Sequence, residues 1–202
     1  MGKSARKQAL KYSPKPKPKP SPWPWPWVIG GVLVLAVAVW GFLRWQGQQG
    51  VPSLESLIEE GKPALAQVQN HPDYGRSHAN IGTSLSYATD PPTSGTHWYN
   101  WSEPGFYTRG EPREKLVHAL EHGNIVIYYD QPSEEVLKTL RVWAGRYRGQ
   151  WDGLVVVPKA GLGQTVELTA WTKLLRLERW DAAAAAAFID TYRGRGPENP
   201  VR

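Results

Sequence analysis

The side chains that suggest a chemical role are those of the five histidines, which all fall within 52 consecutive positions of this 202-residue chain. They are His71, His78, His97, His118 and His122. His118 and His122 are four positions apart in the segment EKLVHALEH, so a helix over 114–122 would project both imidazoles from one face. Two imidazoles on one helical turn can bind the same metal ion. The spacing therefore indicates a candidate metal site.

Other donors could complete this site. Glu121 lies on the same predicted helix, and His97 ends the proline-rich turn PPTSGTH. We predict His97, His118 and His122 as ligands, with His78 or Glu121 completing or orienting the site. Imidazole and carboxylate donors suit Cu(II) or Zn(II). Thiolate and thioether ligands are excluded, because the chain has no cysteine and its single methionine is the first residue. The alternative is that the histidine pair lies on a helix surface or forms hydrogen bonds in the core.

The string HALEH also fits the H-x-x-E-H pattern of a class of metalloproteases, in which the glutamate is the general base. Those enzymes need a longer helix and a distant glutamate ligand. Gly123 is expected to end the helix at once, and Glu198 lies in a proline- and glycine-rich tail that is expected to be mobile. The sequence therefore does not predict an enzyme, although an open coordination position would make hydrolysis conceivable.

The aromatic segment HWYNWSEPGFY, residues 97–107, supports an alternative function without a metal. Such a loop could bind an envelope glycan or a membrane-protein partner, with Trp98 and Trp101 as stacking residues. The simpler interpretation is that its rings only pack against the rest of the domain. These alternatives remain open at the level of the sequence.

The positive charge of the chain is concentrated at its N-terminus. The net charge is +6, but seven lysines and arginines lie in the first 20 positions without a single acid. Residues 47–202 hold 16 lysines and arginines against 18 acids. We therefore expect no nucleic-acid partner, and we interpret residues 1–26 as a basic, proline-rich cytoplasmic tail beside a lipid bilayer.

The next segment, residues 27–43 (WVIGGVLVLAVAVWGFL), has no charge and tryptophans at both ends. We predict a single transmembrane helix here, with the N-terminus cytoplasmic and the C-terminal domain outside the cell membrane. The alternative is a cleaved signal peptide, with residues 36–38 as its small-residue site.

The remaining residues predict an α+β domain with a small, mostly antiparallel sheet and flanking helices. Residues 44–69 are a linker with a short helix that begins at Ser53, and residues 70–198 form the domain. Its expected elements are a possible strand at 83–87, a helix at 114–122, a strand at 125–129, a helix from 132 to 144, strands at 153–157, 166–171 and 173–177, and a helix capped by Asp181. We expect the tail after this last helix to be frayed.

Five segments resemble the DUF3105 family of bacterial membrane-anchored proteins of unknown function, over residues 70–198. They are DPPTSGTHW (90–98), GFY (105–107), VHALEHGNIVIYY (117–129), VELTAW (166–171) and FIDTYRGRGPE (188–198). The resemblance implies that His97, His118, Glu121 and His122 belong to the family's hallmark motifs and that His78 matches a further one. It identifies neither a metal nor a reaction.

Overall fold

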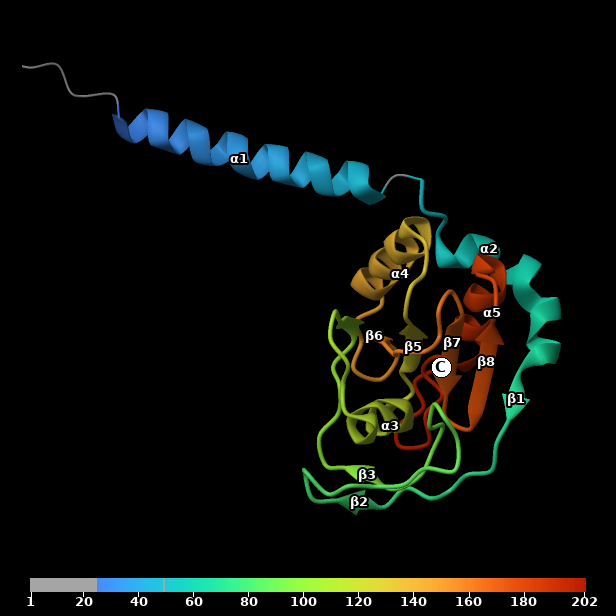
Figure 1. Cartoon of the computed structure of the whole chain (residues 1–202). Helices are drawn as coiled ribbons and strands as arrows, with labels where there is room; N and C mark the ends of the chain where they lie inside the picture. Colours follow the sequence, from blue (N-terminus) through green and yellow to red (C-terminus); the bar gives the residue numbers. More distant parts are fainter. Residues whose placement is uncertain (1–24, 49) are drawn as a thin grey trace, which may run out of the picture. The chain divides into compact units, whose positions relative to one another are not determined.

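The computed structural model of the chain describes residues 25–48 and 50–202 (Figure 1). The predicted basic tail, residues 1–26, therefore lies almost entirely outside the described residues. The chain divides between residues 47 and 48 into an N-terminal unit and a domain.

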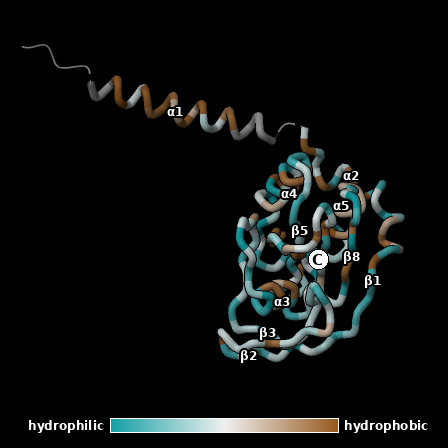
Figure 2. The backbone as a smooth tube through the Cα atoms, viewed as in Figure 1, coloured by the Kyte–Doolittle hydropathy of each residue, from teal (hydrophilic) through white to brown (hydrophobic). Residues whose placement is uncertain are grey.

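The described part of the N-terminal unit is one long helix, α1 (Trp25–Gln48), which contains the predicted helix at 27–43. Apolar residues follow its length (Figure 2), and its side chains from 28 to 43 are exposed. Among the residues that the structure describes, however, no helix combines the length and the apolar character needed to cross a membrane. The helix is thus confirmed, while the prediction that it is transmembrane finds no support in the structure.

The domain is built on a six-stranded, mostly antiparallel sheet, which confirms the predicted α+β class. Its strands, in spatial order, are β1 (Gln69–Asn70), β8 (Lys173–Leu177), β7 (Val166–Ala170), β5 (Ile125–Tyr129), β6 (Leu154–Pro158) and β4 (Gly105–Phe106). The pairs from β1 to β5 are antiparallel, whereas β6 runs parallel to both β5 and β4.

Helices cover both faces of this sheet, so its strands β5 and β6 are apolar on both sides. Ile125 and Ile127 of β5 pack with α2 (Leu54–Gly61), α4 (Glu134–Arg146) and α5 (Ala182–Tyr192). Val126 and Tyr128 point to the opposite face and pack against α3 (Arg113–His122). Alternate residues of one strand therefore belong to two separate cores.

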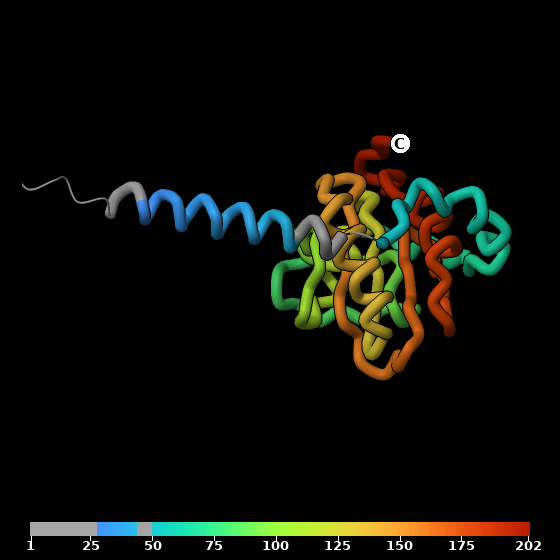
Figure 3. Tube along the Cα trace, turned by 90° about the horizontal axis from the view of Figure 1, so that it is seen from above, coloured from blue at the N-terminus to red at the C-terminus, as the bar shows by residue number. Residues whose placement is uncertain are grey.

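The short helix η1 (Lys62–Gln67) follows α2, and both lie beside α5 (Figures 1 and 3). A Cβ atom on Gly61 would lie only 1.8 Å from the carbonyl oxygen of Ala183. Gly61 and the alanines of α5 thus allow helices α2 and α5 to approach each other closely.

The helix ends follow local capping rules, which the sequence predicts for Ser53, Asp181 and Gly123 but not for Ser133, because that helix is predicted to begin at residue 132. The side chains of Ser53, Ser133 and Asp181 each accept a hydrogen bond from the backbone three residues later, at the starts of α2, α4 and α5. Gly123 ends α3 in the left-handed conformation, with φ of 99°. These predictions succeed because each depends on only a few neighbouring residues.

Two predictions about irregular segments are wrong. Residues 83–87 form no strand, because their polar groups bond to the loop that follows: the indole of Trp98 donates to the carbonyl of Thr83, and the Tyr87 hydroxyl donates to the carbonyl of Thr96. Residues 193–202 are not frayed, because their backbone bonds back to the end of α3, including Gly194 N–H to the carbonyl of Gly123. Both segments lie next to the histidines.

Candidate metal centre

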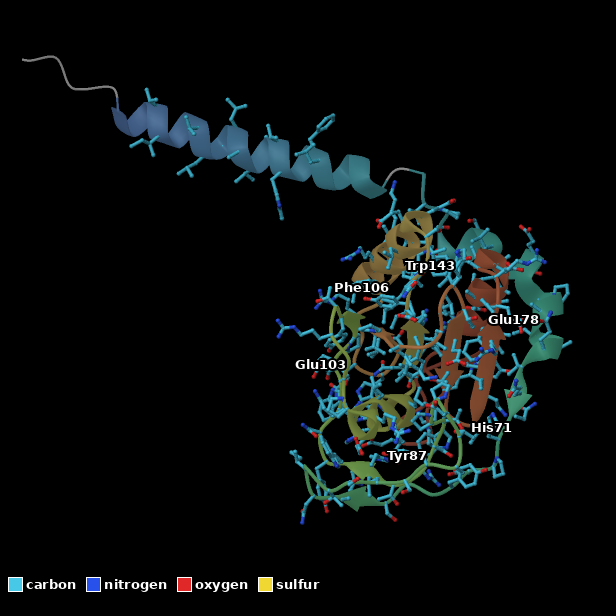
Figure 4. All side chains as sticks on the ribbon, in the orientation of Figure 1. His71, Tyr87, Glu103, Phe106, Trp143 and Glu178 are labelled. Carbon is cyan, nitrogen blue, oxygen red and sulfur yellow. The ribbon has the colours of Figure 1, made fainter. Side chains whose placement is uncertain are left out.

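A short parallel ladder brings the first two histidines together. β2 (His78–Ala79) pairs with β3 (His97–Trp98) so that His78 lies directly opposite His97. The Nε2 atoms of the two imidazoles are 3.3 Å apart. Tyr87, labelled beneath α3 in Figure 4, holds the loop before β3 through its bond to Thr96.

Helix α3 packs against β3 and supplies two more donors. The carboxylate oxygen Oε2 of Glu121 lies 3.0 Å from Nε2 of His97 and 3.8 Å from Nε2 of His78. The rings of His78, His97 and His118 have their centroids 4.6 to 4.9 Å apart. One donor atom from each of these four residues lies within 4.8 Å of the other three. The structure therefore gathers four of the five predicted site residues around one point.

Backbone carbonyls determine where the protons of two imidazoles lie. Nδ1 of His97 is 2.8 Å from the carbonyl oxygen of Gly95, and Nδ1 of His118 is 2.7 Å from that of Trp98. A carbonyl can only accept a hydrogen bond, so each Nδ1 carries the proton and each Nε2 of the neutral ring has a free lone pair. Metal-binding histidines are held in this same way by a partner on the other ring nitrogen.

The Nε2 lone pair of His97 lies between two groups: Oε2 of Glu121 at 3.0 Å and Nε2 of His78, which is within hydrogen-bond distance at 3.3 Å. Oε2 of Glu121 is buried and has no hydrogen-bond partner, and the His97 side chain is fully buried. A buried acceptor without a donor is costly. A tetrahedral zinc ion with bonds of about 2.0–2.1 Å holds its ligand atoms about 3.3 Å apart, close to the separations seen here. The arrangement is therefore suited to a cation.

Burial also sets the protonation of these groups. It lowers the pKa of His97 and of His118 and raises the pKa of Glu121. Neighbouring imidazoles lower both histidine pKa values further, although the carbonyl hydrogen bonds oppose this effect. The imidazoles of His97 and His118 are thus neutral at pH 7, which is the form that binds a metal.

His122, the fifth predicted residue, belongs to a second group. Its Nε2 lies 3.1 Å from Oε2 of Glu198, and donor atoms of His118, His122 and Glu198 lie within 4.8 Å of one another. Burial, followed by the nearby imidazoles, lowers the pKa of His122 to about 4. The side chains of helix α3 thus point in different directions. The five predicted site residues divide between two groups of donors, and His118 belongs to both groups.

Glu198 is the residue that the sequence interpretation missed, because its tail was expected to be mobile. Instead, the N–H of Glu198 donates to the carbonyl of Glu121 across 3.3 Å. Gly123 and Gly196 permit this contact: a Cβ on Gly196 would lie 2.2 Å from both the Glu121 carbonyl oxygen and the Gly123 nitrogen. One feature of the sequence could have identified Glu198. The segment FIDTYRGRGPE ends at this residue and is one of the five segments that resemble the family.

Aromatic residues surround both groups. Trp101 packs on His118 and His122 at centroid distances of 5.4 and 4.6 Å, and Trp151 packs on His122 at 4.3 Å. Tyr99 stacks on His78 and is 62% exposed. Much of the aromatic segment 97–107 therefore lines the histidines, and Tyr99 is its exposed aromatic side chain.

The structure also shows where His71 lies and how the side chains of the H-x-x-E-H pattern are arranged. His71, labelled in Figure 4, takes part in neither group. In the H-x-x-E-H proteases the glutamate activates a water on the histidine-bound metal. Here Glu121 faces His97 and His78 instead. The expectation that no such protease is present stays a prediction, and the mobility of Glu198 no longer supports it, because the backbone of Glu198 is bonded to α3.

Comparison with protein families identifies the family of this chain's domain. A family model described as "Protein of unknown function (DUF3105)" matches residues 78–202. No curated protein and no solved structure matches the chain. The matched segment contains every residue of both groups.

Proposed function

For this chain, which belongs to the DUF3105 family of proteins of unknown function, we propose that the domain binds one transition-metal ion, Cu(II) or Zn(II), through His78, His97, His118 and Glu121. The observation that carries the proposal is the close approach of His97 Nε2 and Glu121 Oε2, 3.0 Å apart, where the buried Oε2 has no hydrogen-bond partner. A cation would satisfy both acceptors at once.

The donor set also indicates the kind of site. Four protein donors complete a tetrahedral shell, so this position would hold an ion without an open place for water or substrate. The chain's own residues would orient the ligands: the carbonyls of Gly95 and Trp98 fix two imidazoles, and α3 presents the carboxylate. A carrier or structural role therefore fits this position better than hydrolysis.

The test is the metal content of the full chain, purified with mild detergent, without a polyhistidine tag and without chelators. After loading with zinc or copper and desalting, we expect close to one equivalent by mass spectrometry. His97→Ala/His118→Ala should retain none. His71→Ala is the matched control, because it removes a histidine outside both groups and should keep one equivalent.

The opposite result would reject the metal. If the loaded natural chain holds no zinc or copper, the histidines are a hydrogen-bonded scaffold. The non-metal alternative would then rest on Tyr99, the exposed aromatic residue of the segment 97–107.

We also propose that the N-terminal segment associates with an anionic lipid bilayer, which would place the domain beside a membrane. Seven cations without an acid precede residue 21, and apolar side chains from 28 to 43 are exposed on α1. Cations near an anionic lipid surface favour binding by about 1 kcal/mol each. The extracytoplasmic location and an envelope or membrane-protein partner follow from this proposal and stay predictions.

A further inference from the structure

We infer that the domain has a second metal position, formed by His118, His122 and Glu198, which is occupied in alternation with the first and from which the ion is released. The inference deepens the proposed function and rests on it. It gives Glu198, and the C-terminal segment of residues 193–202 that carries it, a role in metal exchange.

Three observations make the second group a site. The ring of His122 is 2% exposed and its Nδ1 is buried without a partner. Its Nε2 lies 3.1 Å from Oε2 of Glu198, close to the spacing of two ligands on one tetrahedral ion. A donor atom of His118 completes the group within 4.8 Å. Two imidazoles and one carboxylate are a common protein set for zinc.

The two positions cannot both have their full set of donors at once, because both include His118. Nδ1 of His118 donates its proton to the Trp98 carbonyl, so only Nε2 has a lone pair to give. One lone pair binds one ion. Saturating metal should therefore fill one position per chain.

The two positions differ in what else the ion can bind. The first has four protein donors, whereas the second has three and leaves a fourth place for an incoming ligand. The Glu198 side chain is also 43% exposed, against 31% for His78, which is the most exposed donor of the first position. An acceptor ligand can thus attack the ion at the second position, and a shift of His118 between the groups would deliver it there.

Equilibrium binding to the full chain tests the second position. With zinc as the probe, we expect one equivalent for the natural chain. His97→Ala should still bind one equivalent, at least tenfold more weakly, and His97→Ala/His122→Ala should bind none. Circular dichroism confirms that each variant is folded.

Release kinetics test the alternation with a variant at the surface. Glu198→Gln should keep one equivalent but lose it to a small chelator at least fivefold more slowly than the natural chain. Glu178→Gln is the matched control, since Glu178 is exposed and takes part in neither group. It should release zinc at the natural rate.

The outcomes separate the two proposals. If the natural chain binds no zinc, the proposed function fails, and this inference fails with it. If the natural chain binds but folded His97→Ala does not, only the inference fails. Two equivalents on the natural chain, or unchanged release from Glu198→Gln, would also overturn the alternation.

Discussion

At the scale of single residues, the domain places several hydrogen-bond acceptors close together. Without a cation, these acceptors repel one another or lack a hydrogen-bond partner. His97 and His118 each donate one nitrogen proton to a carbonyl, which turns their second nitrogens, as acceptors, toward the group. Glu121 adds a further buried acceptor. Binding residues of this kind are commonly kept at some cost to the stability of the fold.

Replacing Glu121 with glutamine should therefore change stability and metal affinity in opposite directions. The amide N–H₂ can donate to the His97 lone pair, so the metal-free variant should be about 0.5–1.5 kcal/mol more stable. Its zinc affinity should fall at least tenfold, because a neutral amide is a poorer ligand. Thermal unfolding in chelator and competition titration measure the two effects. A loss of stability in the metal-free variant would show that Glu121 already has a donor.

Acid should destabilise the metal-free domain through His122. Its pKa is lowered from 6.5 to about 4 in the folded state, so the unfolded chain binds a proton between these pH values that the folded chain does not. The free energy of unfolding should thus fall as pH drops from about 6.5 to about 4, by about 3 kcal/mol for this group. Denaturant unfolding of the natural chain and His122→Gln measures the effect by difference. Parallel pH profiles would contradict the assignment.

At the scale of elements, the second group depends on how closely the C-terminal segment approaches the end of α3. Gly194 N–H bonds to the Gly123 carbonyl, and Glu198 N–H bonds to the Glu121 carbonyl. Neither Gly123 nor Gly196 has room for a Cβ atom. Two glycines therefore position a carboxylate that is 76 residues away from His122 in the sequence.

Gly196→Ala should separate these two segments. The new Cβ would overlap backbone atoms at 2.2 Å, so the C-terminal segment must move, and we expect a loss of about 1–3 kcal/mol. Zinc release should slow as in Glu198→Gln. The matched control is Gly145→Ala, because that Cβ meets nothing within 4 Å and α4 should gain up to about 1 kcal/mol. Equal stability of the two variants would show that the contact is not required.

At the scale of the whole molecule, the proposed ion would connect segments far apart in the chain. It would join the β2–β3 ladder to α3, while α3 is packed on the sheet. The N-terminal unit contributes no residue to either group. Metal binding and lipid association are therefore properties of different parts and can be tested separately.

The full chain should bind anionic vesicles and float with them, and residues 48–202 alone should not. Neutral vesicles should bind less of it, because they lack the charge that attracts the N-terminal cations. Extraction at alkaline pH then distinguishes surface association from insertion. Equal flotation of the two chains would place the lipid contact in the domain instead.

Elements that follow local rules could be predicted from the amino-acid sequence alone. The run IVIYY predicts a strand from its β-branched and aromatic residues, and the caps at Ser53 and Asp181 predict where two helices begin. The i, i+4 spacing of His118 and His122, ended by Gly123, predicts the helix that presents them. Periodicity and capping act over a few residues, so these predictions needed no knowledge of the fold.

Only the tertiary structure decided how the donors divide into two groups. His78 and His97 meet through β2 and β3, whose pairing no local pattern announces. Glu198 reaches His122 because a tail that reads as mobile finds backbone partners on α3. The carbonyls that orient His97 and His118 are also set by the folded loop. Long-range packing decides such contacts, because their free energy is gained only after distant segments have been brought together.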